Sequence, residues 1–164
     1  MVEDQLIPIV LSLGSNLADR ESNLAAVVAA LPPQVLVQKA SSLFETDPWG
    51  FIDQPDFLNQ ILVAETHLSA PDLLVYIKAL ESQIGRVPNF RNGPRLVDID
   101  IIFYGDQIIR EPYLEIPHPR FQERAFVLVP LVEIAPDLIV PGTDQKVSDL
   151  LSELDISGVH RYQD

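Results

Sequence analysis

The order in which strand-like and helix-like segments follow one another limits what this chain can fold into more than any other feature. Alternating apolar residues predict strands, alanine-rich or amphipathic periodicity predicts helices, and proline and glycine separate the segments. The expected strands are residues 8–13, 35–44, 57–68 and 97–104, followed by a turn at 105–106 into 108–109 and an extended segment at 116–120. The expected helices are residues 19–31, the segment capped by Ser69 and ended by Gly85, residues 122–131 and residues 147–154.

The resulting order, β-α-β-β-α-β-β followed by helices, resembles the ferredoxin-like plan. That plan is an α+β fold whose antiparallel sheet has helices packed on it as an α/β sandwich. No repeat or linker interrupts it, so we expect a single domain over residues 1–164. Two long segments rich in proline and glycine, 45–56 and 86–96, are expected to be functional loops rather than spacers. Gly14-Ser15-Asn16 is expected to form a turn that ends the first strand and caps the first helix.

Composition argues against several classes of function. The net charge of −13 argues against a nucleic-acid partner, because binding a phosphate backbone needs a basic surface. The absence of cysteine excludes disulfides, thiolate metal sites and a cysteine nucleophile. No apolar run reaches the roughly 18 residues of a membrane helix, and the acidic start does not resemble a signal peptide. We therefore expect a cytoplasmic protein with no membrane partner, and a monomer, because nothing in the sequence requires a dimer.

Arginine is concentrated in one part of this acidic chain. Residues 86–124 contain six of the eleven basic residues, all arginine, and six acids, so the stretch is neutral while the remainder carries the whole net charge. The arginines are Arg86, Arg91, Arg95, Arg110, Arg120 and Arg124. Each of them could simply pair with a nearby acid. As a group they favour an anion site of polyphosphate size, because a guanidinium makes bidentate contacts with phosphate.

The Asp98-Ile99-Asp100 motif points to the most specific chemistry. Side chains alternate along a strand, so both carboxylates lie on one face and Ile99 lies on the other. Two such carboxylates can bind Mg²⁺ ions that hold substrate phosphates, although the same pattern also occurs on solvated strand faces. Gly93-Pro94-Arg95 directly before the strand favours a metal site, since carboxylates beside a fixed arginine suit phosphoryl-type transfer. No Walker A or G-x-S-x-G sequence is present, and His118 could equally bind a ligand or be an ordinary loop histidine.

Five segments, in order, resemble the 6-hydroxymethyl-7,8-dihydropterin pyrophosphokinase family of folate biosynthesis. They are Leu11–Leu17, Asp53–Asn59, Arg91–Ile102, Ile116–His118 and Arg124–Leu131. The resemblance spans roughly residues 7–141 and implies a ferredoxin-like core, ATP as co-substrate and two Mg²⁺ ions as cofactors. It also implies that pyrophosphate passes from ATP to the hydroxymethyl group of 6-hydroxymethyl-7,8-dihydropterin, with release of AMP.

The resemblance implies roles for individual residues as well. The implied metal ligands are Asp98 and Asp100, and the implied catalytic residues are Arg86, Arg95, Asp98 and Asp100. The implied nucleotide-binding residues are Glu81, Arg86, Arg95, Ile101, His118 and Arg124. The implied pterin-binding residues are Thr46, Asp47, Trp49, Phe57, Asn59, Asp98 and Phe126. Phe57 and Phe126 would stack on the two faces of the pterin ring, and the Asn59 amide would bind its edge.

Three positions depart from the family pattern, and two other functions stay open on the residues alone. Phe57, Asn92 and Tyr113 stand where tyrosine, tryptophan and arginine are usual. A palm-like two-metal nucleotidyltransferase would use the same sheet and carboxylates, although the low basic content argues against it. A non-catalytic ferredoxin-like ligand-binding domain would tolerate loss of both aspartates.

Overall fold

The computed structural model describes residues 5–47, 53–85 and 96–163. Its elements in chain order are β1 (Ile7–Ser15), α1 (Arg20–Ala30), β2 (Val35–Ala40), β3 (Phe44–Thr46), β4 (Phe57–Thr66), α2 (Ala70–Ile84), β5 (Asp98–Tyr104), β6 (Ile109–Glu111), β7 (Leu114–Ile116), the 3-10 helix η2 (Phe121–Glu123), α3 (Ala125–Ile134), α4 (Val147–Leu151) and β8 (Val159–Arg161). The main sheet is antiparallel, with strand order β5-β1-β4-β3-β8 and with β2 also paired to β4. Strands β6 and β7 form a separate hairpin. The α+β prediction with a ferredoxin-like antiparallel sheet is confirmed.

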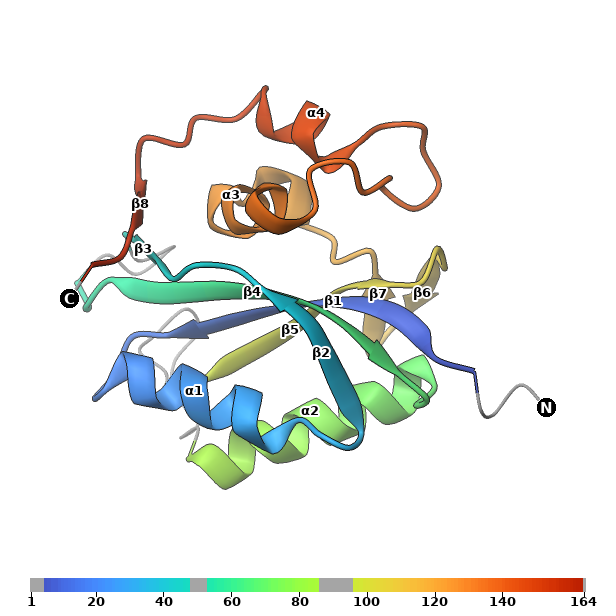
Figure 1. Cartoon of the computed structure of the whole chain (residues 1–164), viewed down its shortest axis with the longest axis horizontal. Helices are drawn as coiled ribbons and strands as arrows, with labels where there is room; N and C mark the ends of the chain where they lie inside the picture. The colour runs from blue at the N-terminus through green and yellow to red at the C-terminus, as the bar shows by residue number, and fades with distance from the viewer. Residues whose placement is uncertain (1–4, 48–52, 86–95, 164) are drawn as a thin grey trace.

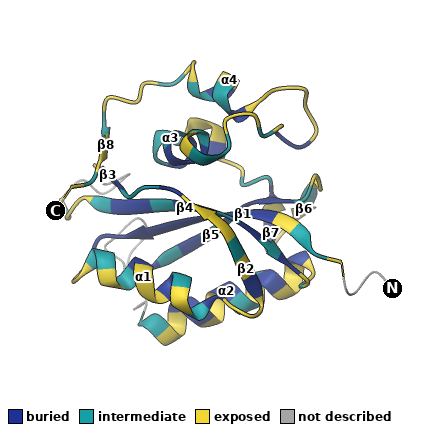
Figure 2. Ribbon diagram, viewed as in Figure 1, coloured by how far each residue is buried: buried dark blue, intermediate teal, exposed yellow. Residues whose placement is uncertain are grey.

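The sheet separates two helical layers. Helices α1 and α2 cover one face, and α3 and α4 lie over the other (Figure 1). Alternate residues of the central strand β1 supply both cores: Leu11 and Leu13 belong to the cluster beneath the sheet, whereas Val10 belongs to the cluster that contains α3 residues. Figure 2 shows buried residues gathered along the central strands and the inner sides of the helices. Close packing on both faces makes these strands a rigid base for functional side chains.

Local signals fix the ends of the two helices beneath the sheet. Helix α2 begins after Ser69, whose Oγ accepts a hydrogen bond from the backbone N–H of Asp72, and ends at Gly85 with φ of 105°. Both of these predicted boundaries are confirmed. Helix α1 instead begins after Asp19, whose carboxylate accepts from the backbone N–H of Ser22. The expected cap at Gly14-Ser15-Asn16 is therefore wrong, because Gly14 and Ser15 continue β1.

Other boundaries also differ from the sequence expectation. The segment 35–44 forms two strands rather than one, since residues 41–43 leave the ladder where the Ser41 hydroxyl accepts from the backbone N–H of Ile61. The expected loop 45–56 begins inside β3, and the helix expected at 122–131 is the short η2 followed by α3. Strands β7 and β8 were not expected at all. Strand β7 is the second arm of a short hairpin with β6, whereas β8 pairs with the distant strand β3, a contact that local patterning does not show.

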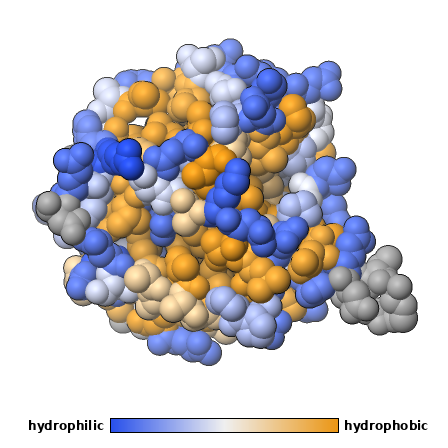
Figure 3. Space-filling model, in the orientation of Figure 1, coloured by the Kyte–Doolittle hydropathy of each residue, from blue (hydrophilic) through white to orange (hydrophobic). Residues whose placement is uncertain are grey.

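Among the helices of the described ranges, none is long and apolar enough to cross a bilayer. Hydrophilic residues are interspersed with hydrophobic ones over the face shown in Figure 3. The large hydrophobic side chains that remain exposed come from separate elements and turns: Leu36, Val75, Ile108, Tyr113, Ile139 and Ile156.

Candidate active site

Three neighbouring strands form the floor of the candidate site. In the ladder, Gly14 of β1 pairs with Asn59 of β4 on one side and with Asp98 of β5 on the other. One pleat further along, Ser12 pairs with Asp100. Because residues two apart share a face, the two carboxylates and the Asn59 amide lie on the same side of the sheet, separated only by a glycine and a serine.

Gly14 is needed here for space rather than for a turn. A Cβ at this position would lie 3.3 Å from Oδ1 of Asn59 and 3.6 Å from Cδ1 of Phe57. The shorter distance is tighter than ordinary van der Waals contact, so a larger residue would displace the Asn59 side chain. A glycine inside a strand often marks this kind of close approach. That signal was present in the sequence but was misread as a turn.

The first cavity opens over this floor. Its volume is about 110 Å³, and it is lined by Ser12, Gly14, Thr46, Asp47, Phe57, Asn59, Asp98, Asp100, Arg124 and Phe126. Six of the seven residues that the sequence suggested for pterin binding therefore line one cavity; they are Thr46, Asp47, Phe57, Asn59, Asp98 and Phe126. The seventh, Trp49, lies outside the described residues. Patterning along the chain did not single out Ser12.

A buried hydrogen bond orients the polar group at the bottom of this cavity. The Asn59 amide Nδ2 donates to the hydroxyl Oγ1 of Thr46 over 2.8 Å, and Asn59 is only 3% exposed. The strand β3 that carries Thr46 is thus joined to β4 by side chains as well as by its ladder. This arrangement holds the amide in one orientation, so that it can recognise a planar ligand edge with both a donor and an acceptor.

The start of helix α3 brings a cation and an aromatic ring over the carboxylates. Nη1 of Arg124 lies 3.8 Å from Oδ2 of Asp100, and its guanidinium carbon lies 5.5 Å from the centroid of the Phe126 ring. Burial first and the Asp98 carboxylate second raise the pKa of Asp100 to about 7, although the charge of Arg124 opposes both effects. Two acids are thus held together against their repulsion, which a bound cation would relieve.

This carboxylate pair fits hard divalent cations. Within the described ranges there is no group of three or more histidine, cysteine, aspartate or glutamate side chains that could hold a metal. A pair of aspartates supplies only part of a coordination shell, and Mg²⁺ is commonly held by one or two carboxylates together with water and substrate phosphates. The donor set therefore fits Mg²⁺ in the company of a phosphorylated ligand better than a metal enclosed by protein.

A second cavity lies on the other side of Asp100. Its volume is about 300 Å³, and its lining residues are Leu74, Ile77, Lys78, Ile99, Asp100, Ile101, Glu111, Pro112, Tyr113, Leu114, Glu115, His118 and Pro119. Ile101 and His118, two residues suggested for nucleotide binding, both line it. Asp100 borders both cavities, so that ligands in the two cavities would meet at the carboxylate pair.

His118 in this second cavity is held in its neutral form. Its backbone N–H donates to the carbonyl of Ile102 on β5, and its Nδ1 accepts from the backbone N–H of Arg120 over 3.2 Å. Burial first and the charge of Arg124 second lower the pKa of His118 to about 4, although the Asp98 carboxylate opposes both effects. With Nδ1 accepting, Nε2 carries the ring proton. The imidazole can therefore donate a hydrogen bond at neutral pH without adding positive charge.

Glu81 occupies a different place from the other suggested nucleotide residues. It is 2% exposed, and among the described residues it does not line either cavity. Its Oε2 accepts the backbone N–H of Ile99 over 2.7 Å, and its Oε1 lies 3.2 Å from Nζ of Lys78. Since Ile99 stands between the two aspartates on the edge strand β5, Glu81 holds the backbone that carries them. Arg86 and Arg95, the remaining suggested site residues, lie outside the described residues.

Fold and site together define a ferredoxin-like α+β protein with a two-carboxylate site between two cavities. Residues 10–136 match the model of the 7,8-dihydro-6-hydroxymethylpterin-pyrophosphokinase family. The chain belongs to this family, and it is therefore an ATP-dependent pyrophosphokinase of folate biosynthesis.

Individual relatives agree with this assignment. The chain is 41% identical over 133 residues to a 2-amino-4-hydroxy-6-hydroxymethyldihydropteridine pyrophosphokinase of Aquifex aeolicus, which covers 81% of this chain and 83% of that protein. It is 41% identical over 155 residues to the protein of the same name from Methylorubrum extorquens, covering 93% and 97%. It also resembles a crystal structure of Plasmodium falciparum HPPK-DHPS, with a TM-score of 0.73 at 17% identity over 91% of this chain and 42% of that one. The last similarity shows the fold alone.

Proposed function

We propose that this protein transfers the pyrophosphoryl group of ATP to the hydroxymethyl oxygen of 6-hydroxymethyl-7,8-dihydropterin. The hydroxyl oxygen would form a bond to the β-phosphorus, the bond from that phosphorus to the α-phosphate oxygen would break, and AMP and the hydroxyl proton would leave. One observation carries this proposal within the family assignment: Asp100 borders both cavities, so that an acceptor in the first and a nucleotide in the second would meet at the carboxylates. Positioning of this kind accounts for much of the catalysis in phosphoryl-type transfer.

The first cavity suits a pterin. Phe57 and Phe126 both line it and can flank a flat heteroaromatic ring, which gains from stacking and from burial of area. The Asn59 amide, oriented by Thr46, would bind the amide-like edge of the pterin. Asp47 and Trp49 are proposed to complete the acceptor side.

The carboxylates and arginines are proposed to handle the polyphosphate. Asp98 and Asp100 would hold two Mg²⁺ ions, which when bound neutralise phosphate charge and polarise the reacting oxygens. Arg124 lies close enough to Asp100 to reach a phosphate bound there. Arg86 and Arg95 are proposed to contact the transferring group, because planar guanidinium groups stabilise its equatorial oxygens.

The second cavity is proposed to hold the nucleoside part of ATP. Ile101 and His118 line it, and the neutral imidazole can donate from Nε2 to a ribose or base acceptor. Glu81 would contribute by holding the Ile99 backbone between the aspartates rather than by touching the nucleotide.

The products of a single incubation test this function. We expect AMP and a pterin diphosphate in equal amounts when the protein is incubated with Mg²⁺, ATP and 6-hydroxymethyl-7,8-dihydropterin. ³¹P NMR and chromatography would detect both products. Omission of the pterin is the control, and it should leave ATP intact. Formation of ADP would contradict the proposal. Release of free pyrophosphate with a nucleotidyl product would instead support nucleotidyl transfer.

A further inference from the structure

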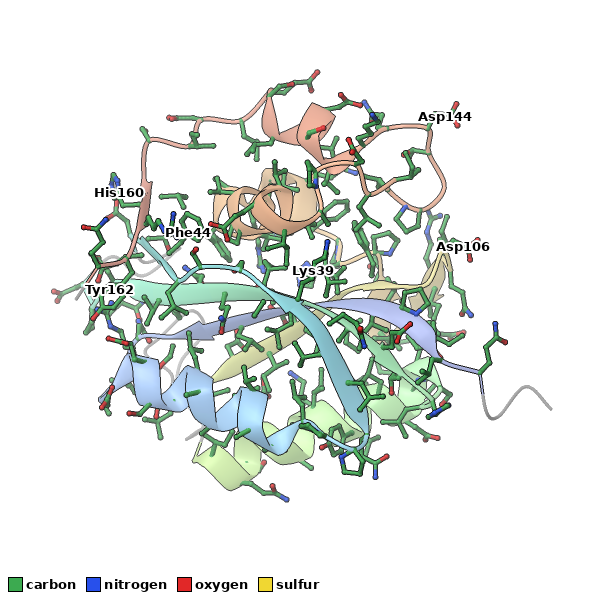
Figure 4. All side chains as sticks on the ribbon, viewed as in Figure 1. Lys39, Phe44, Asp106, Asp144, His160 and Tyr162 are labelled. Atoms are coloured by element: carbon green, nitrogen blue, oxygen red, sulfur yellow. The ribbon has the colours of Figure 1, made fainter. Side chains whose placement is uncertain are left out.

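The C-terminal strand joins the sheet beside the first cavity. Strand β8 pairs with β3, and Val159 lies opposite Thr46. The backbone N–H of Tyr162 then donates to the carbonyl of Leu43 over 2.9 Å. Figure 4 shows Phe44, His160 and Tyr162 at the same end of the sheet. Strand β3, which carries Thr46, is therefore enclosed between β4 and a segment that lies beyond residues 10–136 matched by the family model.

One arginine connects this edge to the rest of the sheet. Nη1 of Arg20, the first residue of α1, lies 2.6 Å from Oε2 of Glu45 and donates to the carbonyl of Asp56 over 3.0 Å. Its guanidinium carbon lies 5.4 Å from the centroid of the Tyr162 ring. We name these four residues, Arg20, Glu45, Asp56 and Tyr162, the Arg20 clamp. An isolated surface ion pair contributes little, but a single guanidinium with three partners restrains three chain segments together.

Two of the points held by the clamp are next to residues that line the first cavity. Glu45 directly precedes Thr46, and Asp56 directly precedes Phe57. Because side chains alternate along β3, Glu45 faces α1 while Thr46 faces the cavity. The clamp thus acts from behind the sheet, at some distance from any ligand in the cavity.

A second set of hydrogen bonds restrains the segment that directly precedes β4. Nδ2 of Asn16 donates to Oε1 of Gln54 over 2.8 Å and to the carbonyl of Pro55 over 3.0 Å. At the C-terminal side, a Cβ built on Gly158 would lie 3.8 Å from Oδ2 of Asp47, so the start of β8 is adjacent to another lining residue. Clamp and strand together restrain one wall of the first cavity.

We infer that Arg20 is a positioning residue for the acceptor: through Glu45, Asp56 and β8 it holds Thr46 and Phe57 in the places from which they line the first cavity. The inference rests on the proposed function, because that function assigns the pterin to the first cavity. Clamp residues are absent from the lining of the second cavity within the described ranges. Loss of the clamp should therefore weaken acceptor binding and leave nucleotide binding unchanged, a pattern that a general loss of stability would not produce.

The test uses the full chain with Arg20→Gln and Glu45→Gln, alone and combined. The matched control is Lys146→Gln, which removes an exposed ion pair with Asp137 of 3.4 Å. Steady-state assays give KM for the pterin and for ATP separately, and calorimetry gives Kd for 6-hydroxymethyl-7,8-dihydropterin. We expect pterin KM and Kd to rise by about fivefold to tenfold for Arg20→Gln, and ATP KM to change by less than about twofold. The double variant should lose little more than Arg20→Gln, because both changes remove the same ion pair.

The kinetic results of these variants separate a role in acceptor positioning from a general effect on the enzyme. Equal rises in the KM of both substrates, or unchanged pterin affinity, would overturn the inference. If Arg20→Gln does not fold at the assay temperature, Glu45→Gln decides, since it keeps the side-chain shape and removes only the charge. Wild-type protein that forms no AMP would contradict the proposed function, whereas active wild type with clamp variants of normal pterin affinity contradicts only the clamp.

Discussion

Nη1 of Arg124 lies 3.8 Å from Oδ2 of Asp100, which joins the start of helix α3 to the edge strand β5. The guanidinium partly offsets the repulsion between the two aspartates and lies beside the Phe126 ring. A cation in this place can stabilise charge on a transferring group while keeping the carboxylates close together.

Substitution of Arg124 should impair turnover more than folding. We expect Arg124→Ala to lower kcat/KM by about 10²- to 10³-fold, the usual effect of removing one group that stabilises transition-state charge. Steady-state kinetics provide the measurement, and Arg161→Ala on the exposed part of β8 is the matched control. A kcat/KM within about threefold of wild type would exclude a catalytic role for Arg124.

Substitution of Asp100 should stabilise the metal-free protein. Burial and the neighbouring Asp98 carboxylate disfavour the charged form of Asp100, as its raised pKa of about 7 indicates. In EDTA at pH 8, where the carboxyl group is ionised, Asp100→Asn should raise the free energy of unfolding by about 1 kcal/mol. Urea denaturation measures this difference. A destabilised variant would mean that the carboxylate contributes more to folding than its repulsion costs.

The lowered pKa of His118 should make the free energy of unfolding depend on pH. Its folded-state pKa of about 4 lies below the value of 6.5 expected for the unfolded chain. Between these values the unfolded state binds a proton that the folded state does not, so the free energy of unfolding falls as pH falls. His118→Asn has no imidazole to protonate, so its free energy of unfolding should fall less steeply with pH. Between pH 7.5 and 4.5 the stability of the variant relative to wild type should rise by about 1 kcal/mol, after allowance for solvent screening. Chemical denaturation across this range measures it, and a constant difference would refute it.

Gly14→Ala should damage the acceptor site selectively. The new Cβ would lie 3.3 Å from Oδ1 of Asn59, so the amide held by Thr46 must move. We expect an approximately tenfold rise in pterin Kd together with a loss of about 1 kcal/mol of stability, while ATP KM stays unchanged. Calorimetry and thermal unfolding measure the two effects. Unaltered pterin affinity would show that the Asn59 orientation does not matter.

Much of the fold could be predicted because its signals are local. Period-two runs located β1, β4 and β5, and Ser69 and Gly85 fixed the ends of α2. The shared face of Asp98 and Asp100 followed from strand alternation alone. These features need no knowledge of the chain elsewhere.

The remaining features depend on contacts between distant segments. Strand β8 pairs with the edge that β3 offers it, and Gly14 is required because the side chains of Asn59 and Phe57 on the neighbouring strand approach it closely. Glu81 was expected on the nucleotide side, yet its carboxylate is engaged by the Ile99 backbone. Sequence spacing does not encode which backbone group a buried carboxylate will meet, so this contact could be seen only in the folded chain.

The central claim is that the two carboxylates support transfer without being needed for folding. AMP formation from ATP and 6-hydroxymethyl-7,8-dihydropterin, measured across a Mg²⁺ titration with wild type, Asp98→Ala and Asp100→Ala, tests it most directly. We expect both variants to unfold cooperatively like wild type and to lose nearly all Mg²⁺-dependent AMP formation. Turnover like that of wild type in either folded variant would contradict the claim.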